Sequence, residues 1–561
     1  MAHRKIVGID LGTTYSAIAH FDEHGRPAVI PNSDNERTTP SVILFEDGRA
    51  VVGKQAKALA VGNPKRVIQF VKDHMGDADW TRDIDGYRFT PEVLSAMILK
   101  RLVLDAEDQL GEKITDAVIT CPAYFNDNER RRTMEAGRLA GLNVLGILNE
   151  PTAAAIAYGL NNLDKRVKAL VFDLGGGTLD VTILEINGND VRVLATDGER
   201  QLGGKDWDEV LVDYLAVRFL KETGIDPRKN PDAFQDLILR AEEAKRALTP
   251  RSKTKILVSC EGHSVKIEVS KQEFEALTEP LLDRVEWCLE QTLKKAKLEW
   301  SDIDTVLKVG GSTRMPQVQR MLLKHWSGEQ ATWVNPDESV AIGAVYWGAI
   351  QRIRQAKREE REAARQARRA ENTAAMRVAK EVPSDMFVLL SDSVVFNVNS
   401  HALGVVTVED DGGHSNRVMI PEQTLIPHQV TQEFTTAFHG QRSVEVRILE
   451  GDDEDPDACI DIGRCVISDL PKDRPRGFRI AVTYRYDEDG VIDVSAEDLQ
   501  TGKEVATRIL RTADVLPPEE ADLQARRVAH LLESGMGSDM DSDERVYREF
   551  MEAEEYGDLD Y

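Results

Sequence analysis

Cysteine is scarce in this sequence, with five residues scattered among 561. Cys121, Cys260, Cys288, Cys459 and Cys465 lack a zinc-like spacing with histidines, so we expect buried or solvated thiols in a reducing compartment. No apolar run approaches the ~20 residues that span a bilayer. The first residues, MAHRKIVGID, enter a predicted strand at once and leave no room for a signal peptide. We therefore expect a cytoplasmic protein without a membrane partner.

Basic residues are also few relative to acidic ones. The sequence has 71 Lys and Arg and 97 Asp and Glu, which gives a formal net charge of −26. That balance disfavours a general nucleic-acid binder, although a local basic patch can exist in an acidic protein. Hydrophobic residues make up 41%, enough for packed cores. A chain of this length is too long for one core, so two or three domains are expected.

The most informative stretch present is Val171 to Leu184, VFDLGGGTLDVTIL. Its pattern predicts a buried strand, a tight turn at Gly175, Gly176 and Gly177, and a returning strand. Glycines carry no side chain, so their backbone N–H groups can approach an anion closely. Asp173 and Asp180 flank the turn and could bind a hydrated cation.

Two further segments strengthen this interpretation. Val7 to Ala19, VGIDLGTTYSAIA, has the same strand and Asp-Leu-Gly turn, so Asp10 and Asp173 could hold a polyphosphate and its Mg²⁺ from both sides. Leu307 to Pro316, LKVGGSTRMP, is a strand running into Gly-Gly-Ser, which suits close passage of the backbone against a flat adenosine. Three purely structural hairpins are the alternative, and their occurrence in this order makes it the weaker one.

The ordered set IDLGTTYS, NEPTAAAIAYG, FDLGGGTLDV, GGKDWD, EEAKRALT and VGGSTRMP resembles the ATPase domain of DnaK-type (70-kDa) heat-shock chaperones over roughly residues 4 to 350. A weaker resemblance continues from about 392 to 511. It implies an α/β actin-like ATPase domain of two lobes with a duplicated fold, then an antiparallel β-sandwich and a short helical or disordered acidic tail. The implied function is that of an ATP-dependent chaperone.

The resemblance and the composition together divide the chain into five parts. These are an ATPase domain (1–350), a charged Arg/Ala/Glu helix (351–384), an apolar interdomain linker (385–398), a peptide-binding β-sandwich (399–512) and a truncated lid with an acidic tail (513–561). We expect the charged helix to be a solvated spacer, with a basic surface for RNA or an acidic partner as the alternative. The linker match favours Asp392 to Val398, where Asn397 stands in place of the family's acid.

The resemblance also implies a catalytic set. Lys72 falls on the family's catalytic lysine, although Asp73 and His74 replace the usual basic-apolar pair beside it. Glu150 resembles the glutamate near the metal-bound water, and Asp10 and Asp173 are the expected metal-side acids, acting through water. The implied catalytic residues are Lys72, Glu150, Asp173, Thr178 and Asp10. The implied cofactors are ATP or ADP and Mg²⁺, with K⁺ left open.

Nucleotide-binding residues follow from the same motifs. Glu242, Lys245 and Thr249 fall on one face of a predicted helix, at spacings of three and four. The full set expected to bind the nucleotide is Gly12, Thr13, Thr14, Tyr15, Gly175, Gly176, Gly177, Gly203, Gly204, Glu242, Lys245, Arg246, Thr249, Gly310, Gly311, Ser312, Arg314 and Asp337.

In the family, a proline and an arginine matching Pro122 and Arg130 relay the nucleotide state to the substrate domain. From the sequence alone we favour the simpler interpretation, a strand-ending proline and a solvated arginine.

For the β domain, the resemblance places a peptide-binding pocket at Val405, Thr407, Val408, Ala437, Val444 and Val446. Core β positions are an equally good interpretation of any one of them. The implied partners are unfolded or extended polypeptides, with a J-domain co-chaperone and a nucleotide exchange factor as further candidates. Only Glu519 to Glu533 is predicted to be helical in the tail, which is too short to latch over a peptide. We therefore expect fast peptide exchange even with ADP.

Two other classes of function remain open at this stage. One is a non-cycling ATP-binding scaffold or regulator of another chaperone, which the absent lid, the inserted helix and Asn397 favour and the retained hydrolytic set opposes. The other is a small-molecule kinase on the same ATPase fold, for which no second-substrate motif stands out.

Overall fold

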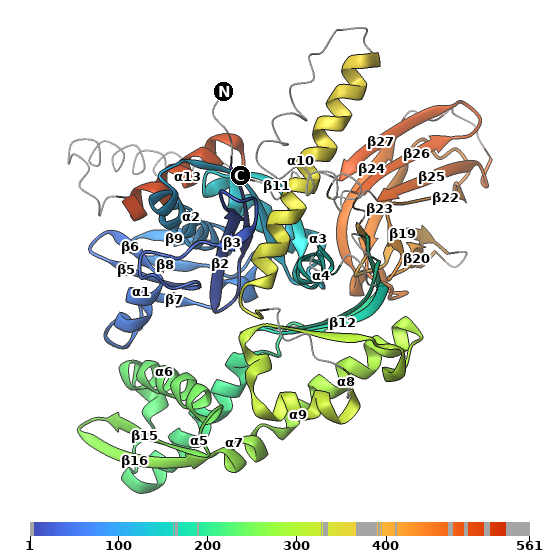
Figure 1. Ribbon diagram of the computed structural model, residues 1–561. Coiled ribbons are helices and arrows are strands. Elements are labelled where there is room, and N and C mark those ends of the chain that lie inside the picture. Colours follow the sequence, from blue (N-terminus) through green and yellow to red (C-terminus); the bar gives the residue numbers. More distant parts are fainter. Residues whose placement is uncertain are drawn as a thin grey trace.

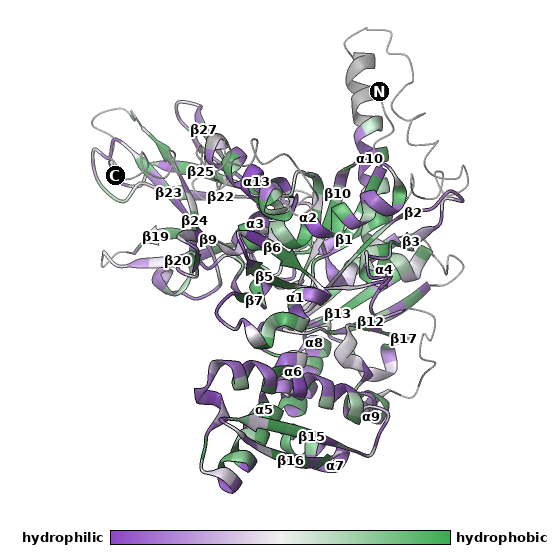
Figure 2. Ribbon diagram, turned by 90° about the vertical axis from the view of Figure 1, so that its left-hand side faces the viewer, coloured by the Kyte–Doolittle hydropathy of each residue, from purple (hydrophilic) through white to green (hydrophobic). Residues whose placement is uncertain are grey.

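The computed structural model describes residues 5–160, 162, 166–187, 190–326, 328, 335–365, 390, 393, 395–409, 412–468, 470, 475–486, 492–509 and 516–533. Figure 1 shows two α/β lobes, blue and green, and a β domain in orange beside them. Figure 2 shows apolar residues along the central strands of the lobes and hydrophilic residues over outward-facing helices such as α6 and α7.

Lobe I is built on a mixed sheet of order β11-β10-β1-β2-β3, with β4 beside β2. Its strands are β1 (Lys5–Asp10), β2 (Tyr15–Phe21), β3 (Pro27–Val29), β4 (Thr39–Pro40), β10 (Ile114–Cys121) and β11 (Asn143–Asn149). Helices α2 (Pro91–Leu110) and α3 (Asp127–Leu139) contribute to the core of this lobe. Asn126 and Glu129 form a capping box at the start of α3, which sets the first residue of this helix after the turn that follows β10.

A small outer subdomain completes lobe I. It has the sheet β6-β5-β7 and a separate hairpin of β8 and β9. Its elements are β5 (Val42–Glu46), β6 (Arg49–Val52), α1 (Lys54–Leu59), β7 (Val67–Gln69), the 3-10 helix η2 (Val71–His74), β8 (Arg82–Ile84) and β9 (Tyr87–Phe89).

Lobe II repeats the arrangement of lobe I. The antiparallel hairpin β12 (Arg166–Leu174) and β13 (Leu179–Asn187) has β17 (Thr305–Val309) parallel to β12, just as β10 runs parallel to β1 beside the β1–β2 hairpin. The further elements are β14 (Asp190–Glu199), α5 (Gly204–Thr223), α6 (Pro231–Leu248), β15 (Lys253–Cys260), β16 (His263–Ser270), α7 (Lys271–Leu277), α8 (Glu279–Ala296) and α9 (Pro316–His325). This duplication agrees with the actin-like two-lobed fold that the sequence predicts.

The two lobes meet where helices α4 (Glu150–Leu160) and α10 (Ser339–Arg365) cross. A Cβ on Gly343 would lie 1.8 Å from the carbonyl oxygen of Ala153, and a Cβ on Gly8 would lie 2.4 Å from that of Ala341. Such distances are far inside van der Waals contact, so only glycine permits this approach. The small-residue segments of the sequence therefore bring α4, α10 and β1 together beneath the cleft.

Helix α10 runs past the expected domain boundary at residue 350 without interruption (Figure 1). Ile353 and Ala356 are buried, and Arg352 is ion-paired with Asp116 of β10. Its first turns after residue 350 are thus packed on lobe I, unlike the solvated spacer that we expected. Residues 366–384 lie outside the described part.

Among the described residues, the β domain has two four-stranded antiparallel sheets, of order β20-β19-β23-β24 and β22-β25-β26-β27. The strands are β19 (Leu403–Val408), β20 (His414–Ile420), β22 (His428–Thr435), β23 (Val444–Glu450), β24 (Ile460–Ile467), β25 (Arg479–Tyr486), β26 (Ile492–Asp498) and β27 (Lys503–Ile509). Residues of both sheets share one core around Tyr484, whose hydroxyl donates to the Gly404 carbonyl at 2.8 Å.

The tail helix α13 (Pro518–Glu533) packs on lobe I beside α2 and α3 rather than on the β domain (Figure 1). Val528 and Leu532 are buried there, and the Arg527 guanidinium lies 3.9 Å and 4.7 Å from the ring centroids of Tyr87 and Phe89. Its bounds nearly equal the predicted helix. The acidic residues 534–561 lie outside the described part, and no helix in the rest is both long and apolar enough to cross a membrane.

Candidate functional site: the cleft between the lobes

A cavity of about 780 Å³ opens between the two lobes. Both hairpin tips, the turn after β17 and helix α6 line it. Of the residues predicted for the site, it is lined by Asp10, Gly12, Thr13, Thr14, Tyr15, Lys72, Glu150, Asp173, Gly175, Gly176, Thr178, Gly204, Glu242, Lys245, Arg246, Thr249, Gly310, Gly311, Ser312, Arg314 and Asp337. Gly177 and Gly203 are not among these lining residues, although Gly203 packs against the backbone of Gly176 and Gly177.

The hairpin tips approach so closely that side chains are excluded between them. A Cβ on Gly176 would lie 2.2 Å from the Thr14 hydroxyl of the other lobe. A Cβ on Gly203 would lie 2.5 Å from the backbone of Gly177. These glycines are therefore required for packing. The tight turn at Gly176 is of the kind that binds anions, whereas the Gly203 N–H donates to Asp206 Oδ2 at 2.7 Å.

Lys72 and Glu150 form a buried ion pair at the floor of the cavity. Lys72 Nζ donates to Glu150 Oε1 at 2.5 Å. Burial alone would lower the pKa of Lys72, but the carboxylates of Glu150 and Asp10 raise it above its ordinary value, so the ammonium is charged. Lys72 lies in η2, where it follows Phe70 in a left-handed conformation (φ 60°).

Three carboxylates, those of Asp10, Glu150 and Asp173, surround Lys72, and when ionised their combined negative charge exceeds its single positive charge. Burial, and next the charge of Glu150, raise the pKa of Asp10 to about 7. Burial and the same neighbour raise the pKa of Asp173 well above its ordinary value. A divalent cation would relieve this repulsion, so the residues fit Mg²⁺. Among the described residues, no group of three or more His, Cys, Asp or Glu is placed to hold a metal ion directly.

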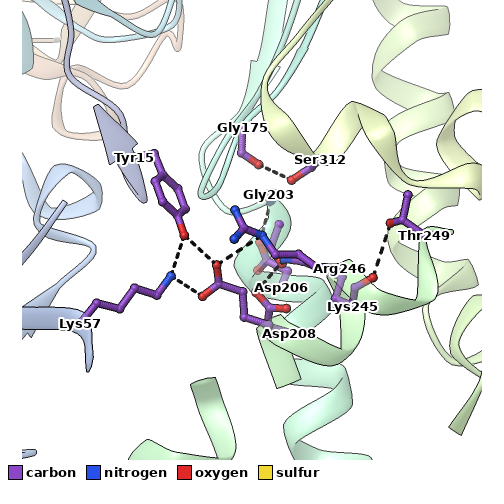
Figure 3. Close-up of polar contacts among 12 residues, drawn as sticks. Tyr15, Lys57, Gly175, Gly203, Asp206, Asp208, Lys245, Arg246, Thr249 and Ser312 are labelled. Carbon is purple, nitrogen blue, oxygen red and sulfur yellow. Dashed lines mark hydrogen bonds and ion pairs between the residues drawn. The ribbon is translucent and has the colours of Figure 1, made fainter. Parts of the chain in front are cut away.

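At the far end of the cavity, residues of lobe I and lobe II are bonded across the cleft (Figure 3). Lys57 Nζ donates to Glu242 Oε2 at 2.6 Å and to the Tyr15 hydroxyl at 2.9 Å, and that hydroxyl donates to Glu242 Oε1 at 3.2 Å. Burial opposes ionisation of Glu242, but Lys57 outweighs it and the net pKa of Glu242 is lowered. The Arg246 guanidinium lies 5.2 Å from the Tyr15 ring centroid. Sequence reasoning found these residues except Lys57.

Lys245 is held in place on lobe II. Its Nζ donates to the Gly204 carbonyl at 2.6 Å and to Asp208 Oδ2 at 2.7 Å. Burial raises the pKa of Asp208 to about 6 despite the neighbouring Lys245. No sequence pattern points to Asp208 beyond its place in GGKDWD. The Thr249 hydroxyl donates back to the Lys245 carbonyl at 3.5 Å.

The turn after β17 closes the third side of the cavity. Ser312 Oγ donates to the Gly175 carbonyl at 2.8 Å, which joins this turn to the central hairpin (Figure 3). Arg314 Nη2 donates to Asp337 Oδ2 at 2.5 Å. Gly310 has φ 80°, and a Cβ there would lie 2.3 Å from the Leu174 carbonyl oxygen. The predicted close passage of backbone is thus present.

The turn after β10 links the cleft to the β domain. Asp180 Oδ1 accepts from the Ala123 N–H at 2.8 Å, and the Ala123 carbonyl accepts from Arg130 Nη2 at 3.0 Å and from Ser400 Oγ at 2.5 Å. Arg130 Nε also donates to the Phe125 carbonyl at 2.9 Å. Arg130 is therefore bonded within this turn, and the solvated arginine that we favoured from the sequence is wrong. Pro122 begins the same turn.

The linker continues the sheet of lobe II into the β domain. β18 (Val395–Val398) pairs parallel with β14 and antiparallel with β21 (Leu425–Ile426). Asn397 Oδ1 accepts from the Thr152 hydroxyl of α4 at 3.1 Å. The Gln423 side chain makes two bonds to the Thr196 backbone, from N–H at 3.0 Å and to the carbonyl at 2.9 Å.

The residues predicted to bind peptide are not all accessible. Val405 and Val446 are buried in the core of the β domain, and Val444 packs against it. The Thr407 hydroxyl donates to the Ser415 carbonyl at 3.3 Å, whereas the Val408 side chain is 44% exposed. Ala437 is half-buried near the β22 end. A peptide pocket at these positions stays a prediction.

Two α/β lobes of repeated topology around a glycine-lined cavity, with a β domain attached through a strand, are typical of a two-lobed nucleotide-binding protein with a second domain. A protein-family model, described as Hsp70 protein, matches residues 6–86, 77–360 and 388–555. The chain therefore belongs to the Hsp70 family, whose members are chaperones with ATPase activity that bind unfolded substrates and co-chaperones.

Proposed function

We propose that this chain is an ATP-dependent chaperone in which nucleotide in the cleft controls the affinity of the β domain for extended apolar segments. One observation carries this proposal. Strand β12 carries Asp173 to the cleft, and the sheet of β12 continues through β13, β14 and β18 to β21 of the β domain. Linkage between two sites requires such a shared element with contacts that differ between states.

The cleft residues suit phosphoryl transfer to water by positioning and charge. Glu150 orients Lys72, whose ammonium stabilises charge on the transferred group and helps to position the attacking water. Asp10 and Asp173 would hold Mg²⁺ through water, with Thr178 beside them, and Mg²⁺ supplies charge neutralisation at the phosphate oxygens. The backbone N–H groups of Gly176 and Gly177 would bind the phosphate chain, since that of Gly175 donates to the Thr178 carbonyl at 3.0 Å.

Nucleotide binding in this scheme lowers peptide affinity and hydrolysis raises it. The Pro122 turn and Asn397 are the expected points of coupling, because each touches the β domain or the linker on one side and lobe I or α4 on the other. A J-domain co-chaperone and a nucleotide exchange factor are candidate partners on the strength of the family alone.

A second candidate is a non-cycling ATP-binding scaffold. The burial of Val405 and Val446 favours it, since two residues of the expected peptide pocket pack in the core instead. The packing of α13 favours it as well, because among the described residues the main contacts of this helix are with α2, α3 and β6 of lobe I.

Fluorescence anisotropy of a short Leu-rich extended peptide, before and after addition of Mg·ATP, separates the two candidates. Binding that ATP reverses supports the chaperone. Binding that ignores ATP contradicts the coupling, and the absence of binding favours the scaffold. Lys72→Ala is the matched control, because it should still release peptide on ATP binding but should not rebind it through hydrolysis.

A further inference from the structure

Asp73 and Lys205 form an ion pair that spans the cleft beside the catalytic lysine. Asp73 follows Lys72 in η2 of lobe I, and Lys205 lies in the first turn of α5 in lobe II. The side chain of Asp73 is 10% exposed and that of Lys205 is 18% exposed. The pair is therefore largely removed from solvent, so its charges interact strongly.

Both residues touch the turn that is expected to bind phosphate. The Lys205 N–H donates to the Gly176 carbonyl at 2.8 Å, and Lys205 lines the cavity. A Cβ on Gly177 would lie 2.5 Å from Asp73 Oδ1, so that carboxylate rests directly on the turn. Asp73 Oδ1 also accepts from the Thr13 hydroxyl of the first hairpin at 3.2 Å.

The other lysines that line the cavity are bonded elsewhere, and the lining arginines Arg228, Arg246 and Arg314 are paired with Asp226, Glu242 and Asp337. Lys72 is bonded to Glu150, and Lys57 and Lys245 lie at the α6 end, bonded to Glu242 and Asp208. Lys205 is likewise paired with an acid, Asp73, but unlike Lys57 and Lys245 it lies against the turn that is expected to bind phosphate. A terminal phosphate beside the Gly175–Gly177 turn would compete with Asp73 for this ammonium.

We propose that Lys205 distinguishes ATP from ADP by passing from Asp73 to the terminal phosphate, with Asp73 as the positioning residue that holds it across the cleft otherwise. This inference rests on the proposed nucleotide site. A diphosphate lacks the terminal group, so with ADP the Asp73–Lys205 pair persists. The ion pair between lobe I and lobe II is therefore present with ADP and broken with ATP.

The test compares the dissociation constants of ADP and of the slowly hydrolysed analogue AMP-PNP by titration calorimetry on the full chain with Mg²⁺. Lys205→Met keeps the length of the side chain and removes its charge. It should weaken AMP-PNP binding roughly tenfold to a hundredfold and change ADP binding by less than about threefold. Asp73→Asn frees the lysine and should tighten AMP-PNP relative to ADP. Lys221→Met, on the exposed far end of α5, is the matched control and should change neither.

If the pair merely clamps the lobes, both variants weaken both nucleotides alike, and that result overturns the proposal. Should Lys205→Met lose both nucleotides through misfolding, Asp73→Asn still decides, because only a shared lysine predicts tighter AMP-PNP binding. A wild-type chain that binds neither nucleotide would instead contradict the proposed function itself.

Discussion

Lys72 Nζ and Glu150 Oε1, 78 residues apart in sequence, meet at 2.5 Å on the floor of the cleft. The pair joins the outer subdomain of lobe I to the start of α4, the helix that crosses α10 between the lobes. A charged lysine held in a buried site needs no reorganisation when charge develops on a phosphate.

Lys72→Ala should therefore abolish ATP turnover while sparing nucleotide binding. Loss of a single preorganised donor typically lowers kcat by about 10² to 10³. Single-turnover hydrolysis measured beside ADP titration checks this. Unchanged hydrolysis would overturn the assignment of Lys72.

Lys57→Ala should speed nucleotide release, because it breaks the bonds from α1 to Glu242 and Tyr15 that hold the lobes together over the far end of the cavity. For a pair of this exposure we expect roughly a three- to tenfold rise in koff, measured by stopped-flow with a fluorescent ADP. Lys54→Ala is the control, since Lys54 lies on the same helix but pairs with Glu36 within lobe I. Equal effects of the two variants would contradict a cross-cleft latch.

The raised pKa of Asp208 predicts that the free energy of unfolding depends on pH. Its folded-state pKa of about 6 lies above the ordinary 3.8, so the folded chain holds a proton there that the unfolded chain has lost between these values. The wild type should accordingly lose stability relative to Asp208→Asn as pH rises from 4 to 6, by up to about 3 kcal/mol, and the difference should be constant above pH 7. Thermal unfolding of both proteins across this range is the measurement. Parallel stability curves for the two proteins would contradict a raised pKa of Asp208.

Removal of α13 should destabilise lobe I, because Val528, Leu532 and Arg527 cover the apolar surface around Tyr87 and Phe89. A chain ending at Leu516 should melt at least about 4 °C lower than the full chain. A chain ending at Glu533 keeps the helix and serves as the control. Matching Tm values for the two truncations would show that the helix adds nothing to the fold.

Gln423→Ala should loosen the edge of β14. The amide side chain occupies both backbone groups of Thr196, so its loss should raise the hydrogen exchange rate of the Thr196 amide by about tenfold. Exchange mass spectrometry on peptides covering β14 tests this. Gln429→Ala, at an exposed residue of β22, should leave that rate unaltered.

Local patterns in the sequence predicted the parts of the site whose chemistry is local. The hairpins of Asp10 and Asp173, the strand before Gly310 and the helix of Glu242 follow from strand, turn and helix signals within a few residues. Sequence patterns do not indicate Lys57 or Asp208, because the partner of each is brought near only by the fold. Glu242, for example, is 185 residues from Lys57. For the same reason the sequence alone predicts an exposed Arg130, whereas in the structure its guanidinium donates to the carbonyls of Ala123 and Phe125.

Helix α10 touches lobe I at Gly8 and α4 at Ala153 within its first turns, yet runs on to Arg365. At ~1.5 Å per residue its described end lies roughly 33 Å beyond the Gly343 crossing. Each degree of tilt at that crossing then moves the outer end by about 0.6 Å, given that length. Because Arg352 and Ile353 hold the helix on lobe I, a rotation of that lobe carries α10 with it, and the outer end of the helix then moves further than the surface from which it projects.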